Sequence, residues 1–195
     1  MTLFDILMKP KVIPPNGLKY MNNFISDEFG NKLYSKLNEE KEWFNVSKYP
    51  KSRQVLNFGY RYNYRHKGLG EKTTLFPDYI IELQHKIEDY LKTTFDQCIV
   101  NKYEPGQSIG AHTDHTVAFD NVIVCVSLNS GIEIEFKKGD KSFCKYLKPN
   151  SLFVMSDECR YEWTHEIKKR RYDMVDNKKI ERDTRISITF RKILC

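Results

Sequence analysis

The second half of the chain places the strongest constraint on the fold, because from Gln97 onward short β-rich segments alternate with turn signals. Turn residues such as Asn129-Ser130-Gly131 and Pro149-Asn150 separate these segments. Many short strands at regular spacing are typical of a β-sandwich or a jelly roll. The predicted strands are 97–103, 121–128, 132–136, 143–147, 151–155, 161–165 and 185–193.

The residues before Gln97 have a different pattern and predict an extension with two helices. Residues 1–25 are rich in proline and asparagine and favour an extended arm. Ser26 can cap a helix whose apolar residues recur at four-residue spacing. A second helix is predicted from Pro77, at the first helical position, to Thr93.

Length and composition predict one soluble globular domain. The chain has 195 residues, 40% of them hydrophobic, which is enough to build one core. Its longest apolar run, 122–126, is too short to cross a membrane, and the polar residues within 3–8 argue against a signal peptide. The five cysteines form no CxxC pair and predict neither a disulfide framework nor a zinc site. We expect an intracellular monomer, in the cytoplasm or nucleus, whose α+β, mostly β domain over 1–195 has an extension over 1–96 and a jelly-roll core over 97–195.

A His-x-Asp pair, His112 and Asp114, is the first candidate for chemistry. Alternate residues of a strand point to the same face, so the two side chains can bind one ion. His165, at the end of the predicted strand 161–165, is the leading candidate for a third ligand. Two imidazoles and one carboxylate form the facial triad of non-haem Fe(II) oxygenases. The remaining histidines lie in a basic loop, on a helix or on the opposite strand face, and are poorer candidates (His66, His85 and His115).

The segment 185–191 adds a second signal, because strand alternation places its apolar and polar side chains on opposite faces. A buried polar face that holds two arginines is costly unless an anion satisfies it. A dicarboxylate such as 2-oxoglutarate would do so through paired arginine contacts. The alternative is an edge strand whose polar face is solvated. The apolar face consists of Ile186, Ile188 and Phe190, and the polar face of Arg185, Ser187, Thr189 and Arg191.

Five motifs occur in register along the chain and together are more specific than any one of them. They are Asn101-x-Tyr103, Pro105-Gly106, His112-x-Asp114, the distal His165 and Arg185-x-Ser187-x-Thr189-Phe190-Arg191. In this order and spacing the chain resembles the AlkB-type Fe(II)/2-oxoglutarate dioxygenases. Within that family it is similar to the oxygenase domain of the tRNA wobble-uridine hydroxylases. The segments that carry this likeness are Asn101-x-Tyr103-Glu104-Pro105-Gly106-Gln107, Ser127-Leu128, Ser151-Leu152-x-Val154-Met155, Arg160-Tyr161-x-Trp163-Thr164-His165 and Thr189-Phe190-Arg191-Lys192. The resemblance covers about residues 55–193 and is strongest over 101–191.

The resemblance implies a double-stranded β-helix, or jelly roll, that uses Fe(2+), 2-oxoglutarate and O2 to oxidise a C–H bond. A hydroxyl group would remain on an ordinary carbon, whereas an N-methyl group would be lost as formaldehyde. The implied iron ligands are His112, Asp114 and His165. The residues implied to bind 2-oxoglutarate are Asn101, Tyr103, Arg185, Ser187 and Arg191. For Tyr103 the alternative is an ordinary core tyrosine.

Residues 48–72 carry seven Lys or Arg side chains and a single acid, and aromatic residues alternate with them. One strand here would have an aromatic face for stacking on bases and a basic face for phosphates. The alternative is an amphipathic strand with its tyrosines in the core. The segment resembles the substrate-recognition lid of AlkB relatives, which implies substrate contacts from Arg61, Tyr62 and Arg65.

Residues 168–182 contain seven Lys or Arg and three acids, and predict a second basic border near the site. The alternative is a solvated loop. Two positions depart from DNA-repair AlkB, because Thr116 stands in place of an acid and Ser187 in place of an asparagine. Both departures favour the branch of the tRNA hydroxylases. Thr116 and Arg160 complete the expected substrate contacts.

The leading prediction is an Fe(II)/2-oxoglutarate dioxygenase that acts on nucleic acid, RNA rather than DNA. The alternatives are a DNA alkylation-repair demethylase and a protein or small-molecule hydroxylase on the same fold. An inactive binding module is disfavoured by the complete set of expected ligands. The multidomain relatives also carry an RNA-recognition domain and a methyltransferase domain. Specificity for tRNA would therefore need separate RNA-binding or methyltransferase partners, or be absent.

Overall fold

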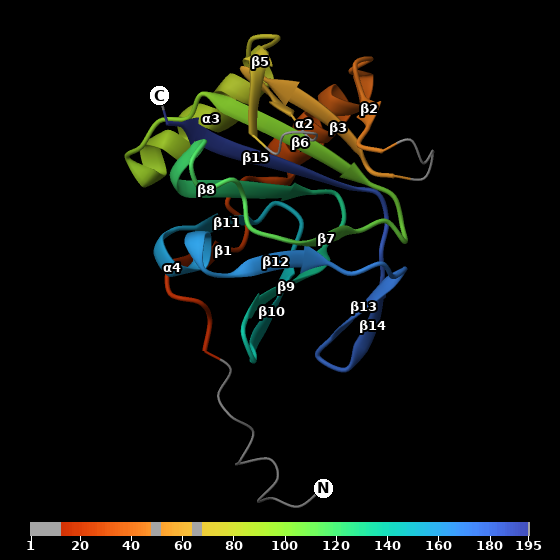
Figure 1. Cartoon of the computed structure of the whole chain (residues 1–195). Helices are drawn as coiled ribbons and strands as arrows, with labels where there is room; N and C mark the ends of the chain where they lie inside the picture. Colours follow the sequence, from red (N-terminus) through yellow and green to blue (C-terminus); the bar gives the residue numbers. More distant parts are fainter. Residues whose placement is uncertain (1–12, 48–51, 64–67, 195) are drawn as a thin grey trace, which may run out of the picture.

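A computed structural model describes residues 13–47, 52–63 and 68–194, and these fold into two facing antiparallel β-sheets with the two longer helices on one side (Figure 1). This is the predicted mostly β, jelly-roll architecture. The larger sheet has the order β1 (Leu18–Met21), β11 (Leu152–Met155), β8 (Phe119–Leu128), β15 (Arg185–Ile193), β6 (Gln97–Tyr103), β3 (Gln54–Phe58) and β2 (Phe44–Asn45). The smaller sheet has the order β10 (Lys141–Leu147), β9 (Ile132–Lys138), β12 (Thr164–Ile167) and β7 (Ile109–His112).

Two amphipathic helices pack on the outer face of the larger sheet. Helix α2 (Asp27–Glu39) begins after Ser26, as predicted, and the Ser26 Oγ accepts a hydrogen bond from the Phe29 N–H at 3.2 Å. Helix α3 (Asp78–Leu91) was predicted with Pro77 as its first helical residue, but Pro77 is the N-cap with extended backbone. The buried helix residues Leu33, Leu37, Ile80, Leu83 and Ile87 share one apolar cluster with Leu56, Phe58, Cys98, Val100, Ile186, Ile188 and Phe190 of the sheet.

A second apolar cluster fills the space between the two sheets, beside the polar face of β15. Strand β8 contributes to both clusters, because Val124 and Val126 face the helices while Ile123 and Cys125 face the smaller sheet. The second cluster is completed by Ile132, Ile134, Phe136, Leu147, Phe153, Met155, Trp163 and Ile167. The larger sheet is therefore covered on both faces, which explains the nearly continuous apolar run of β8.

Several predicted elements differ from the observed ones. The predicted strand 161–165 is wrong, because 157–161 form the short helix α4 and β12 begins only at Thr164. The acidic residues after Ser156 favour a helix start, which outweighed the β propensity of the aromatic residues. The predicted extended arm over 1–25 is in part a strand, since β1 pairs with β11. Its first 12 residues lie outside the described part of the chain.

The basic segment 168–182 was predicted as a loop but contains a hairpin of β13 (Tyr172–Val175) and β14 (Lys178–Glu181). Its two turn residues, Asp176 and Asn177, both have positive φ, at 50° and 61°. Two consecutive left-handed residues match the right-handed twist of the flanking strands in a tight hairpin. The segment therefore has a defined backbone and extends from the smaller sheet (Figure 1).

The predicted single strand with alternating aromatic residues is interrupted at Gly59. This glycine has φ of +77°, and a Cβ there would collide with the carbonyl oxygen of Asp96. The chain turns away from β3 and forms a separate hairpin of β4 (Tyr60–Asn63) and β5 (Gly68–Lys72). Among the described residues, no helix is long and apolar enough to span a membrane.

Candidate metal centre and active site

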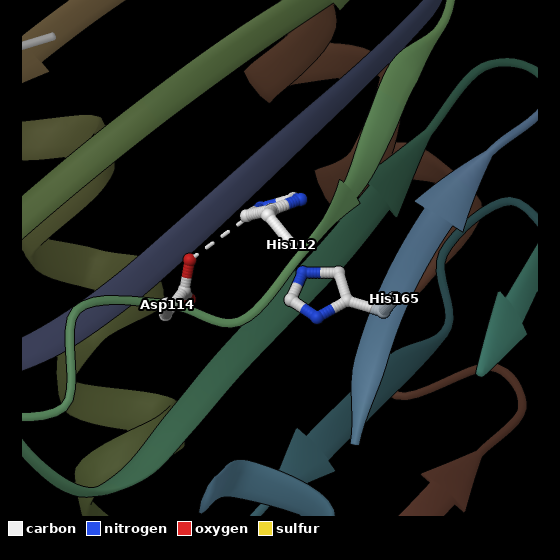
Figure 2. Close-up of side chains that lie close together, drawn as sticks. All are labelled: His112, Asp114 and His165. Carbon is white, nitrogen blue, oxygen red and sulfur yellow. Dashed lines mark ion pairs between the residues drawn. The ribbon is translucent and has the colours of Figure 1, made fainter. Parts of the chain in front are cut away.

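The three residues predicted as iron ligands converge between the two sheets (Figure 2). His112 is the last residue of β7 and pairs directly with His165 of β12, which brings the two imidazoles together. One ligand atom from each of His112, Asp114 and His165 lies within 4.8 Å of the others. The predicted reason for the convergence needs correction, because Asp114 follows the end of β7. The turn after His112, rather than strand alternation, brings the Asp114 carboxylate to 3.7 Å from the His112 Nε2.

Electrostatics hold Asp114 and His165 in the forms that bind a cation. Burial alone would raise the pKa of Asp114, but the Arg191 guanidinium, followed by His165 and His112, lowers it to about 2. Arg191 donates from Nη2 to the Asp114 Oδ1 at 3.1 Å. Burial, with a smaller contribution from His112, lowers the pKa of His165 to about 3. At neutral pH the site therefore offers an ionised carboxylate and a neutral imidazole, the forms that metal binding requires.

Arg160 was expected to contact substrate, but it is 1% exposed and lies under the loop that carries Asp114. Its guanidinium donates to the backbone carbonyl oxygens of Asp114, His115 and Phe119 at 2.8, 2.9 and 3.3 Å. From this buried position it does not reach a substrate. Arg160 instead donates hydrogen bonds to carbonyl groups of the loop that positions the Asp114 carboxylate.

The polar face of β15 lines a cavity beside the three ligands. Strand β15 lies between β8 and β6, so the alternative of a solvated edge strand is wrong. Arg185 is 2% exposed and donates from Nη2 to the Ser127 Oγ at 2.7 Å, while its buried Nε has no hydrogen-bond partner. Within the described residues no carboxylate lies within 4 Å of Arg185. The cavity, of about 60 Å³, is also lined by Asn101, Tyr103, Ser187, Thr189 and Arg191.

Tyr103 lies near the guanidinium group of Arg185, whose Cζ is 5.7 Å from the centre of the Tyr103 ring. Burial raises the pKa of the Tyr103 hydroxyl, against the opposing charges of Arg53 and Arg185. Neighbouring Asn101 accepts a hydrogen bond at its Oδ1 from the Arg53 Nε at 3.0 Å. Asn101 and Tyr103 both border the cavity, and Tyr103 also belongs to the second apolar cluster.

A larger groove of about 540 Å³ opens on the other side of the ligands. His112 and Asp114 line both spaces and so lie at the boundary between the inner cavity and this outer groove. Tyr62 of the β4–β5 hairpin lines the groove and stacks on Phe119, with ring centroids 6.4 Å apart. Burial raises the Tyr62 pKa, so its hydroxyl stays protonated at neutral pH.

The other expected substrate contacts are distributed differently. Arg61 is exposed and lines a separate groove beside α2, while Tyr62, its neighbour, lines both grooves. Thr116 is exposed in the loop after Asp114. Arg65 lies outside the described residues. Arg53, which the sequence suggested only as part of a basic segment, is the residue that the prediction missed, because it lines the outer groove next to Asn101.

The basic segment after His165 carries less free charge than its composition predicts. Lys168 pairs with Glu135 at 2.8 Å, and Arg182 pairs with the buried Asp173 at 2.8 Å. Arg170 contacts both Asp173 and Glu133. Among the basic residues of the segment, only Lys169, Arg171 and Lys178 have no acid within 4 Å in the described part of the chain.

The residues present fit an iron ion and a dicarboxylate. Two imidazoles and one carboxylate with converging ligand atoms match a facial triad, which leaves coordination positions open. Within the described ranges the buried Arg185 has an unpaired Nε and no acidic partner, so an anion bound beside it would satisfy its charge. The three metal-ligand candidates and Arg185 line the same cavity.

Comparisons with known proteins agree with this arrangement. The family model of the 2OG-Fe(II) oxygenase superfamily matches residues 17–191. The chain is 36% identical over 196 residues to the uncharacterized protein L905 of Acanthamoeba polyphaga mimivirus, covering 92% of this chain and 86% of that protein. It is 35% identical over 210 residues to the tRNA (carboxymethyluridine(34)-5-O)-methyltransferase ALKBH8 of Macaca fascicularis. That match covers 95% of this chain but 32% of ALKBH8, so the chain spans about a third of that relative.

The solved structure of OsALKBH1 has the same fold. Its TM-score is 0.67 at 16% sequence identity, and the match covers 92% of this chain and 98% of that one.

Proposed function

Since the chain belongs to the 2OG-Fe(II) oxygenase superfamily and is a dioxygenase of the AlkB type, we propose that it hydroxylates a modified nucleoside in RNA. The observation that carries the proposal is the position of the ligands. His112 and Asp114 lie between an inner cavity that holds the unpaired Arg185 and an outer groove that Tyr62 lines. The similarity to ALKBH8, whose name specifies a carboxymethyluridine of tRNA, supports RNA as the polymer.

In this proposal His112, Asp114 and His165 hold Fe(II) through one atom each. Bound together, Fe(II), 2-oxoglutarate and O2 supply the oxidation of a C–H bond. Arg191 keeps Asp114 ionised through their ion pair, and Arg160 holds the turn that carries it. The residues thus fix the ligand geometry before the substrate binds.

The inner cavity is the proposed site for 2-oxoglutarate. Arg185 would bind the distal carboxylate, with Ser127 fixing the orientation of its guanidinium. Asn101, Tyr103 and Ser187 would donate or accept hydrogen bonds along the length of the molecule, and Arg191 lies nearest the ligands. The apolar residues around the cavity exclude water from the reacting atoms.

The outer groove is the proposed site for the target nucleoside. Tyr62 would contact the base from the hairpin side, since its ring is already held against Phe119. The phosphates on either side would meet the exposed Arg61, Lys169 and Arg171.

Mass spectrometry of nucleosides tests this proposal. The protein is incubated with total tRNA, Fe(II), 2-oxoglutarate and ascorbate, and the RNA is then digested. We expect a uridine derivative that has gained the mass of one oxygen atom, formed only with 2-oxoglutarate and not by Asp114→Ala. Parallel incubations contain methylated DNA. Loss of a methyl group from DNA with no change in any RNA nucleoside would contradict the assignment to RNA.

A further inference from the structure

Arg53 lies at the wall of the outer groove because β3 pairs with β6. In this register Val55 is opposite Asn101 and Gln54 is opposite Lys102, so Arg53 precedes the strand on the side of Asn101 and Tyr103. Its Nε donates to the Asn101 Oδ1 at 3.0 Å. Arg53 lines the outer groove together with Tyr62 and Arg191, but it does not line the inner cavity.

The charge of Arg53 has no counterion within the described residues. Arg191, the other arginine of the groove, pairs with Asp114 at 3.1 Å. Among the described residues that line the groove, Asp114 is the one acid, and it lies beside both Arg191 and the other two metal-ligand candidates. No carboxylate lies within 4 Å of Arg53 in the described ranges, and its terminal nitrogens make no hydrogen bond there. An arginine held by Nε therefore presents a free two-nitrogen edge to the groove.

We infer that Arg53 is a specificity-determining residue that binds an anionic group of the substrate. This inference rests on the proposed function and adds the chemistry that the groove recognises. The free edge of a guanidinium matches two oxygens of a carboxylate or a phosphate. The anion is either a carboxylate on the modified base or the phosphate of the target nucleotide. The tether to Asn101 limits the motion of Arg53, so the anion is bound beside the ligands His112 and Asp114.

A purely structural role for Arg53 would be to orient Asn101 toward 2-oxoglutarate. The two roles differ in what a variant loses. If Arg53 only orients Asn101, then Arg53→Gln and Asn101→Ala both raise the KM for 2-oxoglutarate. If Arg53 binds the substrate, Arg53→Gln weakens RNA binding and leaves that KM unchanged, whereas Asn101→Ala raises it.

Fluorescence anisotropy of two hairpin RNAs provides the test. The RNAs are identical except that one contains carboxymethyluridine and the other its neutral methyl ester. Each is titrated with the Mn(II)- and 2-oxoglutarate-loaded protein, which binds without turnover. The variants are Arg53→Gln, Arg53→Lys and Lys36→Gln, the last removing a charge from the exposed side of α2 as a matched control. Thermal unfolding confirms that each variant is folded.

We expect Arg53→Gln to weaken binding about tenfold, Arg53→Lys to weaken it less, and Lys36→Gln to have no effect. A loss confined to the carboxymethyluridine RNA identifies the base carboxylate as the anion, and an equal loss with both RNAs identifies the phosphate. Wild-type affinity for both RNAs in Arg53→Gln would overturn the inference while leaving the proposed function intact. If the wild-type protein binds neither RNA, both the inference and the proposed function fail.

Discussion

Two groups of basic side chains lie around the same site, and they differ in how their charge is balanced. In the segment 168–182, Arg182 is buried but pairs with Asp173, and Arg170 contacts the same carboxylate. In the inner cavity Arg185 is equally buried but has no acid within 4 Å among the described residues. Sequence composition does not distinguish the paired arginines from the unpaired one, because all of them are predicted to lie near the active site.

The presence or absence of a carboxylate partner distinguishes arginines that stabilise the fold from arginines that bind a ligand. A buried cation is tolerated when a carboxylate is present, and removing that carboxylate is strongly destabilising. Arg182 and Asp173 therefore stabilise the base of the β13–β14 hairpin. A buried cation without a carboxylate is costly in the free protein and gains most when an anion binds. Arg185 is in this second class.

The largest expected effect is on catalysis, from Asp114→Ala. The change removes the charged metal ligand and the partner of Arg191. Mutation of a residue that only hydrogen-bonds to a metal ligand already lowers metal affinity or activity about 10- to 100-fold. Loss of the ligand itself should therefore lower activity by more than that. Succinate formation from 2-oxoglutarate, measured without substrate, is the test. Normal succinate formation by a folded Asp114→Ala protein would show that another residue holds the metal.

The next effect is on stability, from Asp173→Ala. Arg182 would remain buried without a counterion, which costs about 3–5 kcal/mol in the free energy of unfolding. Glu181→Ala removes only an exposed partner of Lys179 and should cost less than about 1 kcal/mol. Denaturant unfolding of both variants measures the difference. Equal stability of the two variants would show that the buried pair contributes nothing.

The Asp173 pair also predicts a pH dependence. Burial opposes ionisation of Asp173, but its hydrogen bonds and charge interactions with Arg182, then Arg170, lower the pKa overall. A lowered pKa in the folded protein contributes stability above the unfolded value of about 3.9, and this is lost as pH falls below it. The stability difference between wild type and Asp173→Asn should therefore shrink from pH 6 to pH 3. A constant difference over this range would assign the effect to packing.

The smallest effect concerns RNA binding and divides the basic segment itself. Lys169 and Arg171 have no acidic partner in the described residues, whereas Lys168 and Arg170 are paired. Replacing Lys169 and Arg171 with glutamine should lower the log–log salt slope of RNA affinity by about 0.7 for each lost phosphate contact. The same change at Lys168 and Arg170 should leave the slope nearly unchanged. Equal slope changes for the two double variants would remove the distinction between paired and unpaired charge.

Much of the core could be predicted because its patterns are local. The bounds of 97–103 and 185–193 are confirmed, since 97–103 holds an apolar run and 185–191 alternates between apolar and polar residues. The polar face of 185–191 is confirmed as buried. In contrast, the strand expected over 161–165 is partly α4, because a five-residue helix leaves little periodicity to detect.

Features that depend on register between distant strands could not be predicted. Arg53 reaches the groove because β3 pairs with β6. In this pairing Val55 lies opposite Asn101, which is 46 residues later in the sequence. Arg160 could be placed in a motif, but not under the Asp114 loop, because the three carbonyl oxygens that it contacts come from another segment. The pairing of the basic segment with β9 likewise depends on contacts between strands that sequence alone does not show.

The most direct test of this account compares 2-oxoglutarate binding and stability in Arg185→Met and Arg182→Met. Isothermal titration of the Mn(II)-loaded proteins gives the affinity, and denaturant unfolding without 2-oxoglutarate gives the stability. We predict that Arg185→Met weakens 2-oxoglutarate binding by at least about 2 kcal/mol without loss of stability. Arg182→Met should lose stability, because the buried Asp173 then keeps only Arg170 of its two arginine partners, and should bind 2-oxoglutarate normally. Unchanged 2-oxoglutarate affinity in Arg185→Met would contradict the central claim that this unpaired arginine binds the cofactor.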